Sequence, residues 1–130
     1  MGEEKAGVFI QQGPHFKIIA YRDEKGKAPA YEFLETLPEK DRFKVEKLFH
    51  LLCNKGKISN RDKFRMERDG IWVFKSYQIR VFCFFAKGKR VVLTHGTIKK
   101  KDKVRKQEIE KAKKIMNEYR QRGWRNEILA

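Results

Sequence analysis

The chain has 130 residues, of which 32 are Lys or Arg and 17 are Asp or Glu, so its formal net charge is +15 at pH 7. Hydrophobic residues make up 40% and aromatic residues 12% of the sequence, which excludes an intrinsically disordered chain and suffices for one ordinary core. So basic a chain attracts polyanions, and nucleic acid is the first candidate partner, although basic surfaces also occur on ordinary soluble domains and on proteins that bind acidic partners.

Several classes of protein are disfavoured by what the sequence lacks. The longest apolar run, residues 81–86, is far too short for a membrane span, and the first residues do not form an export signal. Cys53 and Cys83 lie in apolar stretches without the spacing of metal ligands, which predicts free, buried thiols. We therefore expect a cytoplasmic protein that uses no metal and no cofactor.

The N-terminal half predicts a leader, a strand and two helices. Residues 1–15 are expected to form a flexible leader, and residues 16–130 a single domain. Residues 15–23 are rich in β-forming side chains and predict the first strand. Helices are predicted at residues 28–38 and 39–54 from their apolar spacing, and they should form a helical hairpin.

The C-terminal half predicts a meander of strands followed by a helix. Residues 63–98 alternate between β-rich runs and three turns, at Asp69-Gly70, Tyr77-Gln78 and Lys87-Gly88, which predicts four antiparallel strands. A last helix is predicted at about residues 103–122, with a buried stripe of Ile109, Ala112, Met116 and Tyr119. The order β-α-α-β-β-β-β-α predicts an α+β fold with helices against a curved antiparallel sheet.

The predicted register brings three basic side chains together. If each turn has two residues, Lys75 faces Arg80 and Arg80 faces His95, so all three share one face of the sheet. Two cations directly opposite each other destabilise a sheet, and the neighbouring residues provide no carboxylate. A bound anion would remove the conflict. A three-residue loop at either turn would shift the register by one residue and move the side chains beyond it to the other face of the sheet.

Other residues are weaker candidates, and each also has a purely structural interpretation. A histidine at a strand end, such as His95, is about as often simply hydrogen-bonded to the backbone as it is functional. Taken without their neighbours, Lys99, Lys100 and Lys101 are a solvated run of charges before a helix. Arg65 and Lys63 project to the opposite face by the same register, so we expect them to contact the wider nucleic-acid surface. Tyr77 at a turn could stack on a base, although most such tyrosines are packed or face solvent.

Five segments carry a resemblance to a known family. They are, in chain order, Gly70-Ile71-Trp72, Gln78-Ile79-Arg80-Val81, Leu93-Thr94-His95-Gly96, Lys99-Lys100 and Glu108-Ile109-Glu110-Lys111-Ala112. Together they resemble the RelE/HigB superfamily of bacterial toxins, and most closely its HigB-like, phage-derived branch, over about residues 16–122. The resemblance implies a RelE-like fold and a toxin of a type II toxin–antitoxin system that is held inactive by a small antitoxin protein. It also implies an endoribonuclease that cuts messenger RNA in the decoding site of the ribosome without a metal.

Metal-free RNA cleavage assigns roles to these side chains. A base must take the proton of the ribose 2′-OH, cations must stabilise the charged phosphorane, and an acid must protonate the leaving 5′ oxygen. His95 is expected to be the acid or base, and Arg80 to clamp the scissile phosphate. Lys75 is expected to be a second clamp, or a base if its neighbours lower its pKa, and Lys99 to Lys101 to bind flanking phosphates. Two alternatives stay open, namely a non-enzymatic toxin like the gyrase-poisoning relatives and a nucleic-acid-binding module without chemistry.

The chain departs from the branch's pattern at several positions. Lys75 stands where arginine is common, which keeps the charge and loses the bidentate fork. Val73 replaces the usual glutamate, and Arg105 stands where proline is common. None of these changes removes the basic row.

Overall fold

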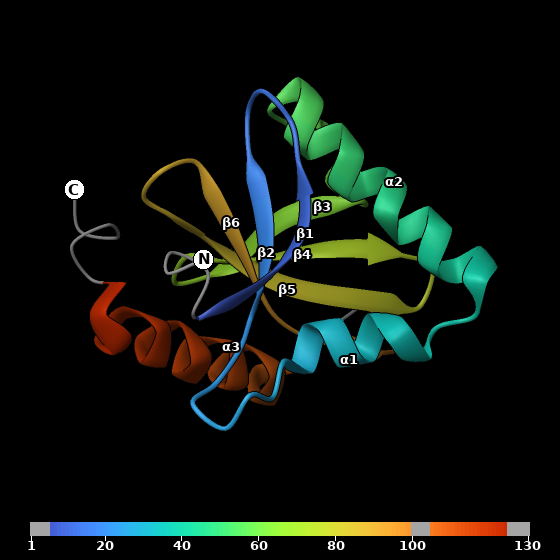
Figure 1. Cartoon of the computed structure of the whole chain (residues 1–130). Helices are drawn as coiled ribbons and strands as arrows, with labels where there is room; N and C mark the ends of the chain where they lie inside the picture. Colours follow the sequence, from blue (N-terminus) through green and yellow to red (C-terminus); the bar gives the residue numbers. More distant parts are fainter. Residues whose placement is uncertain (1–5, 100–104, 125–130) are drawn as a thin grey trace.

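The structure is a computed structural model that describes residues 6–99 and 105–124 (Figure 1). Its elements in chain order are β1 (Gly7–Gln12), β2 (Lys17–Tyr21), α1 (Pro29–Thr36), α2 (Glu39–Lys55), β3 (Phe64–Arg68), β4 (Ile71–Ser76), β5 (Ile79–Ala86), β6 (Arg90–Ile98), α3 (Lys106–Tyr119) and a π-helical turn η2 (Arg120–Trp124). The predicted α+β fold class is confirmed.

The strands form one six-stranded sheet in the order β1-β2-β6-β5-β4-β3. The last four strands are an antiparallel meander, as their alternation and turns predicted. Strand β2 joins the meander by pairing in parallel with β6. A strand from the start of the chain therefore lies directly beside the strand that carries His95.

Strand β1 corrects the prediction of a flexible leader at residues 1–15. Gly7–Gln12 pairs antiparallel with β2 and extends the sheet at its edge. Val8 and Ile10 pack against the core, and this tertiary contact gives the segment its stability. Six residues with one bulge between Phe9 and Gln11 make too short an alternating pattern to identify from the sequence.

Prolines and a glycine set the limits of the first two helices. Pro29 begins α1, and Leu37 ends it with an extended backbone (φ −74°, ψ 143°) because the ring of Pro38 disfavours the helical conformation for the residue before it. Helix α2 ends at Gly56, whose φ of 81° closes the helix in the left-handed conformation. Both helices confirm the predicted hairpin. No helix in the described part of the chain is both long enough and apolar enough to cross a membrane.

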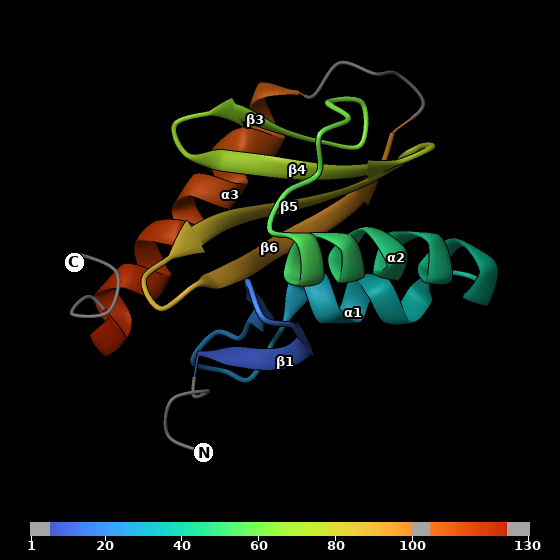
Figure 2. The same ribbon diagram turned by 90° about the horizontal axis from the view of Figure 1, so that it is seen from above.

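Helices cover both faces of the sheet. Helices α1 and α2 lie side by side against one face, and α3 packs on the other (Figure 2). Buried residues of α3 are those of the predicted stripe together with Ile115. The helix begins at Lys106, and η2 continues it past the predicted end at residue 122. The first six residues of β5 are all buried, because β5 lies between the two helical layers. Cys53 and Cys83 are free, buried thiols, as predicted, and burial raises the pKa of Cys53 to about 11.

Gly96 lies where α1 packs closely against the sheet. A Cβ atom on this residue would overlap the ring of Phe33 on α1. Its neighbour His95 lies on the opposite face, toward α3, because successive residues of a strand alternate. Gly96 therefore leaves room for α1 on one face of the sheet, and His95 faces α3 on the other.

We expect Gly96→Ala to lower the free energy of unfolding by about 1–3 kcal/mol, because the added methyl group overpacks a filled site. Urea denaturation measures this change. In a Phe33→Ala background the methyl group has room, so the same substitution should cost much less there. An equal cost in both backgrounds would show that the Phe33 contact is not the reason.

Candidate functional site

Two buried cations face each other where β4 ends and β5 begins. Lys75 pairs with Arg80 across the two-residue turn Tyr77-Gln78, as the register analysis predicted. Only 7% of Lys75 and 1% of Arg80 is exposed. Burial removes most of the water that would screen their charges, so this pairing is more costly here than on a surface.

His95 shares the face of Lys75 and Arg80, but it does not lie in their row. It pairs with Phe82, and Thr97 takes the predicted place opposite Arg80. Arg80 and His95 are therefore diagonal neighbours, which places their side chains about 7–8 Å apart. The His95 ring stacks on Phe82, with ring centres 4.7 Å apart and planes 12° from parallel.

Two irregularities in β5 and β6 explain this outcome. The turn between them has three residues, since Ala86 pairs with Arg90. This extra residue puts Val92 on the α3 face and turns Val91 and Leu93 to the other face. A bulge at Thr94 then adds a second extra residue, because Phe82 pairs with His95 while Cys83 pairs with Leu93. The second shift cancels the first, so His95 returns to the predicted face.

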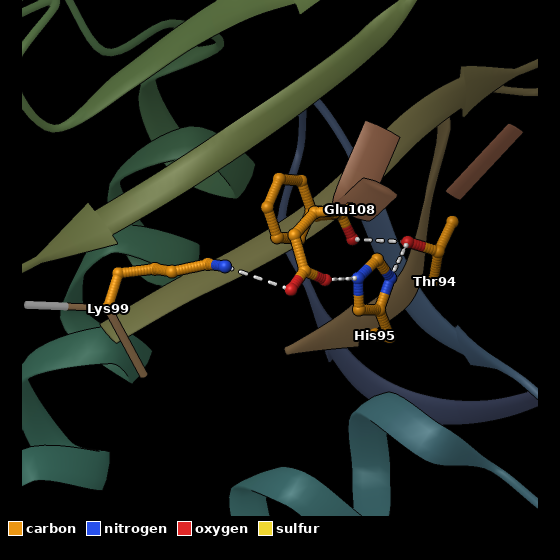
Figure 3. Close-up of polar contacts among 5 residues, drawn as sticks. Thr94, His95, Lys99 and Glu108 are labelled. Carbon is orange, nitrogen blue, oxygen red and sulfur yellow. Dashed lines mark hydrogen bonds and ion pairs between the residues drawn. The ribbon is translucent and has the colours of Figure 1, made fainter. Parts of the chain in front are cut away.

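A carboxylate from α3 completes the site. Glu108, in the first turn of α3, contacts His95 Nε2 with Oε1 at 2.9 Å and accepts a hydrogen bond from Lys99 Nζ with Oε2 at 3.0 Å (Figure 3). We call Lys75, Arg80, His95 and Lys99 the cationic cluster. Glu108 was not among the predicted site residues, because it lies far from Lys75 and Arg80 in the sequence. Its presence in the helix segment of the quoted resemblance was the available signal.

The hydrogen bonds around His95 assign its protons. Burial alone raises the pKa of Glu108, but the hydrogen bonds from His95 and Lys99 outweigh it and hold the pKa below 4.5, so the carboxylate is ionised. Burial lowers the pKa of His95 below 6.5, against the opposing effect of Glu108. A neutral ring beside a carboxylate carries its proton on Nε2, so Nδ1 accepts from Thr94 Oγ1 at 3.1 Å. Both ring nitrogens are thus bonded within the protein.

Arg80 also supports the turn beside it. Its Nη1 atom donates to the carbonyl oxygen of Ile79 at 3.1 Å and to that of Tyr77. The N–H of Lys75 donates to the carbonyl oxygen of Lys63 at 2.8 Å, so the backbone of Lys63 lies beside this end of β4. The guanidinium therefore has a structural task in addition to any task on a phosphate.

The prediction for Arg65 was wrong about the face. A bulge at Glu67 shifts the pairing of β3 by one residue, so Arg65 lies opposite Val73 on the face of the cationic cluster. There its Nε atom donates to Glu67 Oε2 at 2.8 Å. Lys63 and Tyr77 are exposed, and Lys100 and Lys101 lie outside the described residues.

A separate hollow lies at the other end of α3. This cavity of about 470 Å³ contains none of the predicted site residues and is lined by Tyr21, Asp23, Glu24, Lys25, Glu118, Gln121 and Arg122. Tyr21 donates to Glu118 Oε1 at 3.2 Å, and Arg122 donates to the carbonyl oxygen of Arg22. These bonds fasten the C-terminal end of α3 to β2.

Within the described residues, no group of three His, Cys, Asp or Glu side chains is arranged to hold a metal ion.

We expect acidification to destabilise the protein through His95. The folded state holds the pKa of His95 below 6.5, so the unfolded chain binds this proton first as the pH falls. The stabilisation is therefore complete above pH 6.5 and is lost as the pH falls through the lower, folded-state pKa. His95→Gln should flatten this slope in urea denaturation between about pH 7.5 and 5. His50→Gln, at an exposed position on α2, is the matched control, and an unchanged slope in the His95→Gln variant would contradict the assignment.

Comparison with protein families identifies the chain. The model of the family described as phage-derived Gp49-like proteins (DUF891) matches residues 32–117, which extend from α1 to α3 and include Lys75, Arg80, His95 and Glu108. No curated protein matches the sequence. Two thirds of the chain lie within the matched family, and the cationic cluster lies wholly within that part. The chain belongs to the phage-derived Gp49-like family, which is a RelE/HigB-like family of toxins from toxin–antitoxin systems.

Proposed function

We propose that this protein is the toxin of a type II toxin–antitoxin system and that it cleaves messenger RNA on the ribosome, with its active site at the cationic cluster. The proposal includes a small antitoxin protein as the partner that holds the toxin inactive. The observation that carries it is the convergence of Lys75, Arg80, His95 and Lys99 on one end of one sheet face. Family membership supports a toxin, and the cluster supports a phosphodiester as its target.

The chemistry follows from the side chains in the cluster. The ribose 2′ oxygen attacks the adjacent phosphorus, and the bond from phosphorus to the 5′ oxygen breaks. The ammonium group of Lys75 gives a proton to the leaving 5′ oxygen, so the products are a 2′,3′-cyclic phosphate and a 5′ hydroxyl. Arg80 and Lys75 stabilise the additional negative charge of the phosphorane. Because its pKa lies below 6.5, His95 is neutral at pH 7. Once Glu108 has moved aside, the ring proton can lie on Nδ1, where Thr94 Oγ1 accepts it, and Nε2 then takes the proton of the 2′-OH as a general base.

The substrate must first displace an internal anion. Glu108 occupies His95 Nε2 and Lys99 Nζ, which are the donors that a phosphate oxygen would use. An RNA phosphate therefore competes with the Glu108 carboxylate, and the side chain of Glu108 must move aside for His95 to reach the ribose. Bound RNA would take over the role of Glu108 as the counter-ion of the cluster.

One observation favours a second candidate, a toxin that acts without cleavage. His95 is only 2% exposed and both of its ring nitrogens are bonded, while Arg80 is bonded to backbone carbonyl groups. These are the contacts of structural residues. A non-enzymatic toxin on this scaffold would need the cluster only for folding, and the experiment below separates the two candidates.

We expect Arg80→Ala and His95→Ala to abolish growth arrest on induced expression, and His95→Ala to slow cleavage of messenger RNA on purified ribosomes by about 10²- to 10⁴-fold. Primer extension on transcripts measures the cuts. Arg80→Lys keeps the buried charge and should retain part of the activity, and Lys25→Ala on the exposed loop before α1 is the surface control. Urea denaturation of every variant separates loss of activity from loss of the fold.

The double variant decides between the candidates. If Arg80→Ala with His95→Ala remains folded and still arrests growth while transcripts stay intact, the toxin is not a nuclease. Growth arrest by the unaltered protein without cuts in any transcript would have the same meaning.

A further inference from the structure

Tyr77 has a backbone conformation that a tyrosine rarely adopts. Its φ is 55°, in the left-handed region that favours glycine or asparagine, and 78% of the residue is exposed. A tyrosine in this position pays a conformational cost and gains little burial in return. The other two hairpin turns share this conformation at Asp69 and Lys89, so the turn itself requires it. The fold does not require a large, exposed aromatic ring at that position, which points to a role for the ring outside the fold.

The turn that carries Tyr77 is held firmly by the cationic cluster. Arg80 donates to the carbonyl oxygen of Tyr77, and the N–H of Lys99 donates to the carbonyl oxygen of Gln78 at 2.6 Å. Ser76 and Ile79 pair on either side of the turn. The backbone is therefore fixed while the exposed ring projects outward from the turn, between Lys75 and Arg80 in the chain.

Lysines of α2 lie over exposed aromatic rings at the same end of the molecule. Lys44 Nζ is 4.5 Å from the ring centre of Tyr77, and Lys47 Nζ is 5.6 Å from that of Phe43, which is 60% exposed. The first turns of α2 and the turn between β4 and β5 point to the same side in both views (Figures 1 and 2). Within the described part of the chain, neither lysine has a carboxylate at ion-pair distance.

We propose that Tyr77, Phe43, Lys44 and Lys47 form a docking platform for single-stranded RNA. Unpaired bases stack on exposed aromatic rings, and phosphates bind the lysines beside them. A surface that binds a protein partner typically has an apolar patch with few charges at its centre. Here a lysine ammonium group lies over each ring, and the chain has a net charge of +15. The proposal rests on the proposed function, because it gives the RNA that reaches the cationic cluster its last contacts outside the cut site.

Substitutions at Tyr77 separate the ring from the fold. Asparagine accepts the left-handed backbone, so Tyr77→Asn should leave the urea midpoint unchanged or raised while removing the ring. The probe is a fluorescein-labelled, 2′-O-methylated single strand, which cannot be cut because its 2′ oxygen is blocked. By fluorescence anisotropy we expect Tyr77→Asn to weaken binding about five-fold or more, and Tyr77→Phe to retain the affinity of the unaltered protein.

Matched controls separate the platform from the general basic charge. Phe9, which is 54% exposed on the edge strand β1, is replaced by Asn and should leave the affinity unchanged. Lys44→Ala should reduce the slope of log K against log salt by about 0.7, the value for one phosphate of a single strand, and Lys25→Ala should not. A duplex of the same sequence should bind the Tyr77→Asn variant as well as the unaltered protein, since its bases are already paired.

Two results would overturn the platform. One is an unchanged affinity of Tyr77→Asn for the single strand, which would leave protein docking as the use of this surface. The other is an equal loss for strand and duplex, which would exclude stacking. If the unaltered protein binds the blocked strand through Tyr77 and yet cuts no natural RNA, the cleavage proposal fails and the platform stands.

Discussion

The burial of like charges at one end of the sheet is the constraint on which the site depends. Lys75 and Arg80 face each other with almost no exposure to water, and Lys99 follows directly after the next strand, which carries the neutral His95. Such charges persist inside a protein only where counter-charges and hydrogen bonds compensate them. Glu108 supplies part of that compensation by bridging His95 and Lys99, and the backbone carbonyl groups at Tyr77 and Ile79 supply another part to Arg80. The helix α3 is thereby fastened to the sheet at the point where the cations gather, so the packing of the helix and the protonation of the site are linked.

The same constraint explains why the candidate site is closed in this conformation. The acceptor that stabilises His95 and Lys99 occupies the donors that a phosphate would need. A polyanion can bind there only by providing as much compensation as the carboxylate it replaces. The free-energy cost of moving Glu108 is a natural source of selectivity, because a ligand with a single weak contact cannot offset it. A strand that is also held by stacking and by lysines outside the cluster can offset this cost. The exposed aromatic residues of α2 and of the turn between β4 and β5 would contribute in this way.

The position of His95 illustrates how two local irregularities give a regular result. A three-residue turn shifts the side chains of β6 by one place, and the bulge at Thr94 shifts them again. The first part of the strand therefore presents Val92 to α3, and the later part presents His95 to the same layer. The hydroxyl oxygen of Thr94 lies 3.1 Å from His95 Nδ1 and 3.3 Å from the carbonyl oxygen of Phe82, and its single proton is donated to one of them at a time. The bulge thus places the histidine on its face and also supplies the hydrogen bond that orients its ring.

By itself the sequence determined the helices, the meander and the identity of the basic residues. Helix spacing, the prolines around α1 and the residue pairs at the turns are local signals. They can be recognised in the sequence without knowing which elements pack against them. Only the tertiary structure decided that Gly7–Gln12 is a strand, that Arg65 lies on the face of the cluster, and that Glu108 reaches His95. Edge-strand pairing, bulges and contacts between a helix and a sheet depend on what packs from elsewhere in the chain. One inserted residue reverses the face of every side chain beyond it, so register counted from turns alone holds only until the first bulge.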